Sequence, residues 1–451
     1  MAMTVVRRSR GPFPMLRKRM RNSFLFVPFA GLLLGWLLAT AVVQTDTLIH
    51  DLDARWTAVD LADLWFLRTA ADLGASAKSA VASMSSAMLT FIGVVFSITL
   101  VALQMAAGQF TPRVLRLYVE SRVTKLTLAV FLCTFLYTLR LQKEYTAAAG
   151  DADGADGAVV PYVGASLAMG FLVLSLALFV VYVHSTIRLM RVTYVMDHVG
   201  EESLALIRES AEPALPGQEG GHEADPPPDP GGSVVPHVWR PGVLQAVDVE
   251  RLVALAEREG LVLHLIPRIG DYLVPYTPLF RVTGGPTPPD AVLQAALDIG
   301  VERTTEQDLA FGIRQLADIA SRALSPAVND PTTAVQSLDR IQVLLTALAR
   351  QPLGRARHRD RGGAVRLVET LPSWPELLDL ALTEIRDYGV GSVQVTRRIA
   401  ACLDDLEQLA PPERREPVRR HRDLLEEAVW TAAPSPLRAA FALQPDRQGI
   451  G

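Results

Sequence analysis

The sequence predicts an α-helical integral membrane protein with four transmembrane helices and a cytoplasmic C-terminal region made of a small α+β module and a helical domain. The first observation behind this prediction is a set of long apolar runs before residue 190. The second is a change, after that point, to short β-type segments and amphipathic helices. With 49% hydrophobic residues among 451, the composition fits a membrane anchor joined to a soluble portion.

The four apolar runs cover residues 24–43, 87–107, 126–139 and 159–187. A helix needs about 20 mostly apolar residues to cross the hydrocarbon core, and three of the runs reach that length by themselves. The third reaches it only as a helix from Val123 through Arg140, with Lys125 and Arg140 extending their charged ends to the two interfaces.

Charges between the spans predict that both termini are cytoplasmic, because Lys and Arg are retained on that side during insertion. Residues 7–21 and 113–125 are basic, whereas the connections at 46–72 and 144–156 are acidic. Cleavage of the first run as a signal peptide, at Ala39-Thr40-Ala41, is the alternative. The run exceeds the roughly 7 to 15 residues of a signal core, which favours a retained span.

Pattern and composition divide the chain into six parts. These are a basic cytoplasmic N-terminus at 1–23; a four-helix transmembrane domain at 24–190 with an extracytoplasmic helical segment at 46–80; a helical extension and disordered Pro/Gly linker at 191–237; an α+β module at 238–284; a cytoplasmic helical domain at 285–433; and a frayed tail at 434–451.

The module begins with a strand at 242–247, and Asp248 is the expected N-cap of a helix at 249–259 that Gly260 ends. Short strands follow at 261–267, 272–274 and 279–282. In the helical domain, Asp330 and Pro331 predict the start of a helix. Further helices are expected at 374–388, 392–409 and 412–430, with a basic loop at 355–363.

Several chemical classes are disfavoured by composition. A net charge of -4 gives no overall affinity for nucleic acid, and the two cysteines, Cys133 and Cys402, supply no disulfide framework. No His/Cys cluster has metal-ligand spacing, and neither a phosphate-binding loop nor a nucleophile elbow occurs. We therefore predict no cofactor, no metal and no enzymatic activity.

Two stretches resemble a bacterial family of predicted membrane proteins, domain of unknown function 2254. The first runs from Arg303-Thr304-Thr305-Glu306-Gln307-Asp308 through Ala327-Val328-Asn329-Asp330-Pro331-Thr332-Thr333-Ala334. The second runs from Phe96-Ser97 to Gln109-Phe110-Thr111-Pro112-Arg113. The resemblance implies a multi-pass protein of the bacterial plasma (inner) membrane with a cytoplasmic C-terminal domain. It implies no reaction, ligand or catalytic residue.

A polar stripe on the second span is the first candidate site. Its members recur at steps of three or four and share one helix face: Thr90, Gly93, Ser97, Val101, Gln104 and Gly108. Close packing against another helix is one interpretation, since small residues let backbones approach. The other is a pore face in an oligomer, with Ser97 and Gln104 offering neutral groups to a partly dehydrated ion.

The second candidate site is a polar set in the helical domain: Asp308, Arg314, Asp318, Arg322, Asn329, Asp330, Thr332 and Thr333. It predicts either a small-ligand or anion site at a helix N-terminus or a helical corner held by capping and ion pairs. Arg355, Arg357, Arg359 and Arg361 form either a solvated loop or a contact with anionic lipid headgroups.

No Asp, Glu, Lys or Arg lies in the middle of a span, which argues against a proton-coupled pump. The leading hypothesis is therefore an oligomeric channel or passive transporter, with a cytoplasmic assembly or gating domain. Its expected partners are the lipid bilayer, other copies of the chain and a small ion or anionic ligand. The alternative is a non-conducting, membrane-anchored sensor or scaffold that binds a ligand or partner through its cytoplasmic domain.

Overall fold

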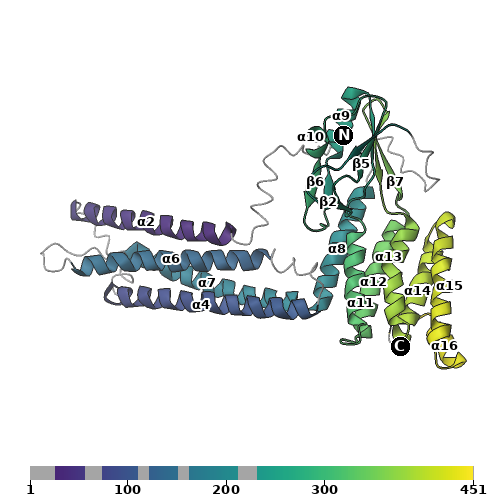
Figure 1. Ribbon diagram of the computed structural model, residues 1–451. Coiled ribbons are helices and arrows are strands. Elements are labelled where there is room, and N and C mark those ends of the chain that lie inside the picture. Colours follow the sequence, from purple (N-terminus) through teal and green to yellow (C-terminus); the bar gives the residue numbers. More distant parts are fainter. Residues whose placement is uncertain (1–25, 56–73, 110–120, 151–161, 212–230, 450–451) are drawn as a thin grey trace, which may run out of the picture. The chain divides into compact units, whose positions relative to one another are not determined.

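The computed structural model describes residues 26–55, 74–109, 121–150, 162–211 and 231–449 (Figure 1). These residues divide into two compact units, an N-terminal unit that ends at Arg191 and a C-terminal unit that begins at Val192. Each unit has its own core. The expected basic N-terminus and residues 212–230 of the expected linker lie outside the described residues.

The N-terminal unit consists, in its described part, of α2 (Phe26–Arg55), α4 (Gly74–Gln109), α6 (Arg122–Gly150) and α7 (Tyr162–Leu189). All four are long and apolar enough to cross a membrane, which confirms the four expected spans. Of the expected helical segment at 46–80, residues 56–73 lie outside the described residues. Residues 46–55 continue α2, since nothing between Gln44 and Arg55 breaks a helix, and residues 74–80 begin α4.

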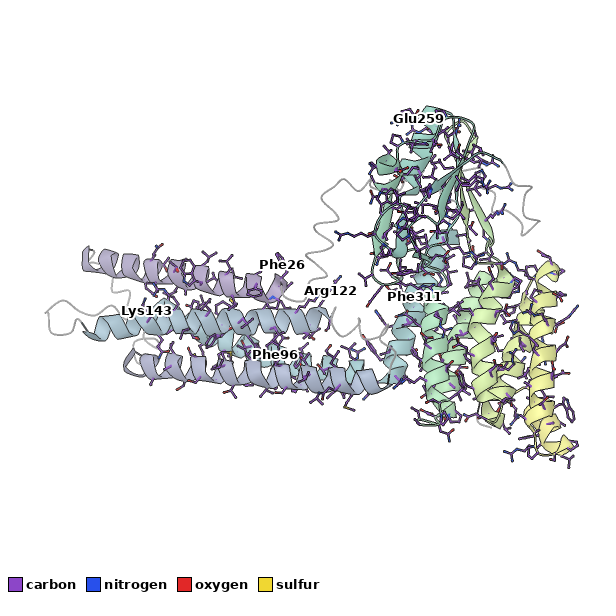
Figure 2. All side chains as sticks on the ribbon, viewed as in Figure 1. Phe26, Phe96, Arg122, Lys143, Glu259 and Phe311 are labelled. Atoms are coloured by element: carbon purple, nitrogen blue, oxygen red, sulfur yellow. The ribbon has the colours of Figure 1, made fainter. Side chains whose placement is uncertain are left out.

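Helix α6 is the central helix of the bundle. In its most apolar stretch 56% of the residues are buried, against 22% in α2 and 17% in both α4 and α7. Phe131, Tyr137 and Leu141 of α6 are fully buried, whereas Phe96 of α4 points outward and is 54% exposed (Figure 2). Because α6 meets other helices more than lipid, it tolerates the threonines within the third run.

Helices α2 and α6 pack closely at two glycines of α2. A Cβ added at Gly31 would collide with the main chain of Ala129, and one added at Gly35 would collide with that of Cys133. Two glycines four residues apart on one face are a known basis for close helix contact in membranes. Gly31-Leu32-Leu33-Leu34-Gly35 was thus a readable packing signal, which the sequence analysis did not use.

The helices of the C-terminal unit form one layer after another, in nearly sequential order (Figure 1). Their bounds are α8 (Val192–Ala211), α11 (Phe311–Ala323), α12 (Pro331–Leu348), α13 (Trp374–Gly389), α14 (Val393–Leu409), α15 (Arg415–Ala432) and α16 (Pro436–Ala442). Helix α8 packs on α11 and α12. Arg340 of α12 donates to Asp197 of α8 at 2.7 Å.

The α+β part contains ten elements: β1 (Ser233–Pro236), β2 (Gly242–Val247), α9 (Val249–Glu259), β3 (Val262–Leu265), β4 (Tyr272–Leu273), β5 (Pro278–Thr283), α10 (Asp290–Gln294), β6 (Leu297–Gly300), β7 (Arg355–Arg359) and β8 (Val365–Thr370). They build a five-stranded sheet, β1-β5-β3-β8-β7, and a three-stranded sheet, β4-β2-β6. Strands β3 and β8 run parallel. One core of apolar side chains from α9 and both sheets holds this part together.

The helix caps fall where the sequence places them. Asp248 accepts the N–H of Arg251 at 3.1 Å, and Gly260 ends α9 in the left-handed region with φ of 70°. Asp330 caps α12, accepting the N–H of Thr333 at 3.1 Å, with Pro331 at the first helical position.

Three expectations for the C-terminal region need correction. Residues 355–363 are not a basic loop, because residues 355–359 form β7 and turn into β8, with Arg355 and Arg357 alternating with inward Ala356 and His358. The α+β part therefore extends beyond residue 284. Strand β1 also lies inside the expected linker, where it pairs with β5.

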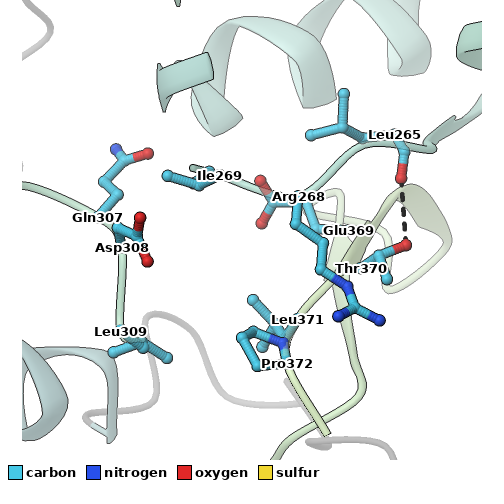
Figure 3. A pocket seen from close by; sticks show the side chains of 10 residues that line it. All are labelled: Leu265, Arg268, Ile269, Gln307, Asp308, Leu309, Glu369, Thr370, Leu371 and Pro372. Carbon is cyan, nitrogen blue, oxygen red and sulfur yellow. Dashed lines mark hydrogen bonds between the residues drawn. The ribbon is translucent and has the colours of Figure 1, made fainter. Parts of the chain in front are cut away.

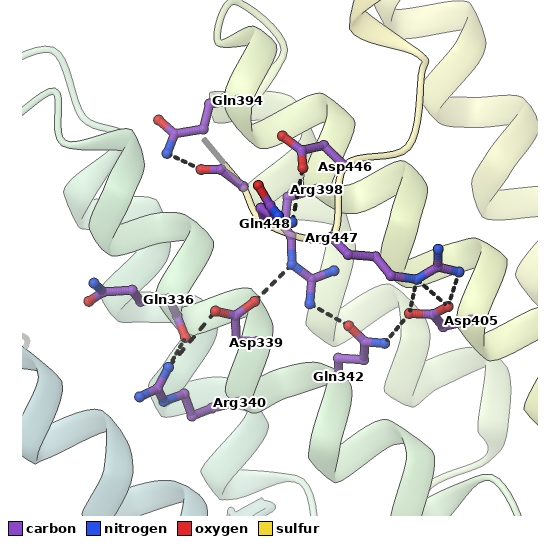
Figure 4. Close-up of polar contacts among 11 residues, drawn as sticks. Gln336, Asp339, Arg340, Gln342, Gln394, Arg398, Asp405, Asp446, Arg447 and Gln448 are labelled. Carbon is purple, nitrogen blue, oxygen red and sulfur yellow. Dashed lines mark hydrogen bonds and ion pairs between the residues drawn. The ribbon is translucent and has the colours of Figure 1, made fainter. Parts of the chain in front are cut away.

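The tail expected to fray over 434–451 is ordered as far as it is described. Ser435 caps α16 by accepting the N–H of Arg438 at 3.3 Å, and Pro436 opens the helix. Beyond it, Arg447 donates to Asp405 at 2.7 Å, and Asp405 accepts from Gln342 at 2.9 Å (Figure 4). The Ser-Pro start of α16, the Arg447–Asp405 ion pair and the Gln342 hydrogen bond account for this order. Residues 450–451 lie outside the described residues.

Candidate functional sites

The polar stripe of the second span lies on the outside of the N-terminal unit. Thr90, Gly93, Ser97, Val101 and Gln104 are all exposed. A Cβ added at Gly93 would meet nothing within 4 Å among the described residues. Gly108 belongs to α4, but its surroundings lie outside the described part. No helix of the same chain, as far as described, covers this stripe.

The stripe runs along the middle of the exposed face of α4. On the opposite side Met88, Val95 and Ala102 are buried against the bundle. Large exposed apolar side chains flank the stripe on both edges: Leu89, Phe96 and Leu100 on one, Val94 and Met105 on the other. A single chain in lipid would therefore present a polar line bordered by apolar residues.

The polar groups of the stripe differ in how they are satisfied. Thr90 donates to the carbonyl of Ser86 at 3.1 Å, within its own helix. Ser97 and Gln104 have no hydrogen-bond partner among the described residues. Because a polar group in hydrocarbon without a partner is costly, these two side chains favour contact with another polar surface.

A second set of polar groups, which the sequence analysis missed, lies inside the bundle. Ser85 donates to Thr138 at 2.8 Å, and the hydroxyls of Thr134 and Ser175 lie 3.2 Å apart. All four side chains are buried. The signal was present in α6, where Thr127, Thr134 and Thr138 recur at helical spacing in the least apolar span. These neutral groups satisfy one another between helices.

Asp46 also connects two helices, a role that the acidic composition of the predicted connection at 46–72 did not indicate. Its carboxylate accepts the N–H groups of Val163 at 3.2 Å and Gly164 at 3.0 Å. It therefore caps the start of α7 from the far end of α2, where free N–H groups favour negative charge. Tyr137 of α6 donates to the carbonyl of Gly164 at 2.9 Å and ties a third helix to the same point.

The polar set of the C-terminal unit separates into three groups. The first stands before α11, where Arg303 Nε donates to Asp308 at 2.8 Å and the N–H of Ala310 donates to the same carboxylate at 3.2 Å. Burial raises the pKa of the Asp308 carboxyl, and the Arg303 charge and the backbone N–H groups oppose that shift. Arg303 also lies over the ring of Phe311.

The second group sits in the middle of α11. Arg314 donates through both terminal nitrogens to Glu384 of α13, at 2.7 Å each, and through Nε to Asp318 at 2.5 Å. Hydrogen bonds to these carboxylates hold the pKa of Arg314 well above its usual range. Glu384, 70 positions away, was not in the predicted set.

The third group forms the corner between α11 and α12. Asn329 is in the left-handed region with φ of 48°, and Asp330 accepts the Thr333 hydroxyl at 2.5 Å. Pro331 has no N–H, and the carboxylate of Asp330 already occupies the position an anion would take. Arg322 and Thr332 are exposed. The eight residues thus do not meet in one site, although Arg314 and Asp318, and Asp330 and Thr333, do pair.

A small, shallow hollow lies where the parallel strands β3 and β8 end (Figure 3). Its lining combines apolar side chains with charged ones, and Asp308 is the one residue of the predicted set that reaches it: Leu265, Arg268, Ile269, Gln307, Asp308, Leu309, Glu369, Thr370, Leu371 and Pro372. The Glu369 carboxylate lies 2.6 Å from His358 Nε2. The carboxyl ends of parallel strands are a common location for small-ligand sites. Among the described residues no group of His, Cys, Asp or Glu could hold a metal ion.

Four apolar spanning helices followed by a compact C-terminal unit of helices and two sheets define a multi-pass membrane protein. A family model described as "Predicted membrane protein (DUF2254)" matches residues 21–405, and the chain belongs to this family. An uncharacterised protein of Mycobacterium bovis and one of Mycobacterium tuberculosis are each 30% identical to it over 411 residues, 88% of this chain and 74% of the relative. No solved structure matches.

Proposed function

We propose that this protein is an oligomeric channel or passive transporter, in which the polar stripe of α4 faces the stripes of other copies across a central axis. The observation that carries the proposal is the exposure of Thr90, Gly93, Ser97 and Gln104 on a single chain. In hydrocarbon such a stripe favours association, and in a ring its neutral groups would line a path. No enzymatic activity and no cofactor form part of this proposal.

Conductance measured on purified protein in planar bilayers tests the pore. Ser97→Leu and Gln104→Leu should each reduce or abolish it, because a bulky apolar side chain replaces a hydrogen-bonding group at the axis. Val94→Leu is the matched control, since Val94 is 39% exposed on the flank of the same helix face. A well-folded oligomer that conducts nothing, or one that Gln104→Leu leaves unchanged, contradicts the pore.

The proposed orientation places both termini in the cytoplasm and the chain in the plasma (inner) membrane of a bacterium. Support comes from the basic residues at 7–21 and 113–125 and the acidic ones at 46–72 and 144–156. Reporter enzymes fused after residue 21 and after residue 449 should both be active in the form that requires the cytoplasm. An externally active fusion at either position overturns this orientation.

The alternative function is a non-conducting sensor or scaffold, and the hollow at the ends of β3 and β8 favours it. Charged Arg268, Asp308 and Glu369 beside apolar Leu265 and Ile269 could recognise a small polar molecule. An oligomer that is silent in bilayers, together with a ligand-induced rise in the unfolding temperature that Glu369→Gln removes, would support this function over the channel.

A further inference from the structure

The segment after α16, Gln444–Gly449, lies against α14 and α12 and forms neither a helix nor a strand (Figure 4). Its main chain is bound by α14 in both directions. The N–H of Asp446 donates to the carbonyl of Arg397 at 3.1 Å, and Arg397 Nε donates to the carbonyl of Gln444 at 3.1 Å. We call Gln444–Gly449 the strap, because it joins these two helices from outside.

Gly449 occupies a position of the strap that only glycine fits. It is buried, and its φ of 62° lies in the left-handed region. A Cβ added to it would approach Val335 Cγ1 of α12 to 2.5 Å and Arg398 Cδ of α14 to 3.7 Å. Gln394 of α14 donates to the Gly449 carbonyl. The strap therefore lies directly on the stem of Arg398, and a side chain at this position would displace it.

Below the strap, Arg398 begins a line of polar contacts that ends at α8. Arg398 Nε donates to Asp339 of α12 at 2.8 Å, and Arg340 Nη1 lies 3.9 Å from the same Asp339 carboxylate (Figure 4). Arg340 in turn donates to Asp197 of α8 at 2.7 Å. Only residues 190 and 191 separate α8 from α7, the fourth span. The line therefore leads from the strap to the helix that leaves the membrane domain.

An ion pair of the strap reaches Arg398 by a second route. Arg447 donates to Asp405 at 2.7 Å, and this hydrogen bond lowers the pKa of the Asp405 carboxyl, so the pair is charged at neutral pH. Gln342 of α12 donates to Asp405 at 2.9 Å and accepts from Arg398 (Figure 4). Docking of the strap thus affects the position of Arg398 at its stem and at its guanidinium.

The contacts of the strap are those of a weakly held segment. Gln444, Pro445 and Gln448 are exposed, and the Arg447 side chain is 64% exposed, where an ion pair stabilises little. Arg398 is 6% exposed, yet its Nη1 has no hydrogen-bond partner among the described residues. A buried donor without a partner costs free energy that water would remove. Segments with few apolar contacts and exposed hydrogen bonds are those that open locally.

We propose that the strap is a displaceable regulatory segment. When docked, it fixes Arg398 against Asp339 and so holds α12 in its contact with α8. When it leaves, Arg398 gains water, and the Asp339 carboxylate that Arg340 and Arg398 share is no longer held. The contact between Arg340 and Asp197 then loosens. An effect of the strap on conduction rests on the proposed channel, whereas its effect on α8 does not.

Hydrogen exchange of the full-length protein in detergent, measured by mass spectrometry, tests this device. Gly449→Ala should displace the strap, and exchange should become faster within 444–449 and, by about threefold or more, in the part of α8 around Asp197. Gly363→Ala is the matched control. Gly363 also has a positive φ, of 85°, but a Cβ there would meet nothing within 4 Å, so both segments should exchange as in the wild type.

Two further variants make the test independent of misfolding and specific for coupling. Arg447→Gln alters an exposed side chain only and should have the same, smaller effect on α8, whereas Arg438→Gln, an exposed arginine of α16, should have none. Arg340→Met removes the ion pair with Asp197 directly. Adding Gly449→Ala to Arg340→Met should speed exchange in α8 no further, because members of one network do not act additively.

Two outcomes overturn the proposal. Faster exchange in the strap of Gly449→Ala with unchanged exchange in α8 would make the strap an ordinary packed segment. Additive effects of Gly449→Ala and Arg340→Met would show that the strap and α8 are independent. Bilayer conductance of the same variants is recorded separately. An oligomer that is silent in all of them contradicts the proposed channel, and coupled exchange in that oligomer still supports the strap.

Discussion

The two units of this protein satisfy their buried polar groups in different ways. In the N-terminal bundle buried hydroxyls pair with one another, as in the pairs of Ser85 with Thr138 and Thr134 with Ser175. In the C-terminal unit the pairs are mostly ion pairs of arginine with carboxylates, such as Arg314 with Asp318 and Glu384. The solvent explains the contrast, because a charge left unpaired during folding costs much more in lipid than beside water.

The stripe of α4 differs from the interior of the bundle in how its polar groups are satisfied. Inside the bundle Ser85 pairs with Thr138 and Thr134 with Ser175 between helices, whereas Ser97 and Gln104 face outward with no partner in the described residues. The C-terminal unit has a parallel case on its edge strand β7, where Arg355 and Arg357 make no ion pair with a described residue. In both units, then, interior groups such as Ser85 and Arg314 are paired, whereas these polar or charged groups on the surface have no such pair among the described residues.

Close backbone contact, rather than polar pairing, should dominate the stability of the bundle. Gly31→Ile would force a branched side chain into the main chain of Ala129 and should cost about 3 kcal/mol or more. Thermal unfolding in detergent, followed by size-exclusion chromatography, measures the loss. Gly170→Ile is the control, since its Cβ would meet nothing within 4 Å. Equal unfolding temperatures for the two variants would show that α2 does not depend on this contact.

Charge pairing should dominate in the C-terminal unit. Arg314→Met would remove the guanidinium that pairs with Asp318, 8% exposed, and with Glu384, and should cost about 3 kcal/mol. Arg258→Met removes an arginine from a solvent-exposed pair with Glu259 and should have almost no effect. Chemical denaturation of both variants measures the difference. Adding Asp318→Asn to Arg314→Met should recover part of the loss, and failure to do so would locate the effect in lost packing.

The buried carboxyl of Asp308 gives a pH-dependent test. Burial raises its folded-state pKa above the ordinary 3.8, so folding favours the protonated form. Its contribution to stability is therefore complete below pH 3.8 and is lost as pH rises through the folded-state pKa. Compared with Asp308→Asn, the wild type should lose unfolding free energy from acid to neutral pH. The opposite slope would mean that the ion pair with Arg303 outweighs burial.

What could be predicted from the sequence is mostly local. The caps at Asp248 and Asp330 depend on residues within a turn of each other, and the four spans depend on runs of apolar residues; both are confirmed. Strand β7 was missed because its arginines make the segment read as a basic loop rather than as alternating outward and inward residues. Its partner β8 pairs with β3, about a hundred residues earlier in the chain, and local sequence cannot reveal such a long-range pairing.

The candidate sites show the same limit. Helical spacing identified the α4 stripe as one face, but whether another helix covers that face depends on the tertiary structure. In the Asp308 to Thr333 set, neighbours in sequence were expected to form one site, yet a helix of 13 residues spreads them over about 20 Å. Glu384, the main partner of Arg314, came from another helix that no local spacing reveals.

Removing one hydroxyl pair from the bundle should have the smallest effect. Thr138→Val deletes the acceptor of Ser85 while keeping the shape of the side chain, and hydrogen bonds between membrane helices average about 0.6 kcal/mol. A double-mutant cycle with Ser85→Ala measures the coupling directly. A coupling free energy as large as the loss from Arg314→Met would contradict the expected difference between hydroxyl pairs in the bundle and ion pairs in the C-terminal unit. It would mean that the Thr138 hydroxyl is as indispensable in lipid as a buried cation is in the C-terminal unit.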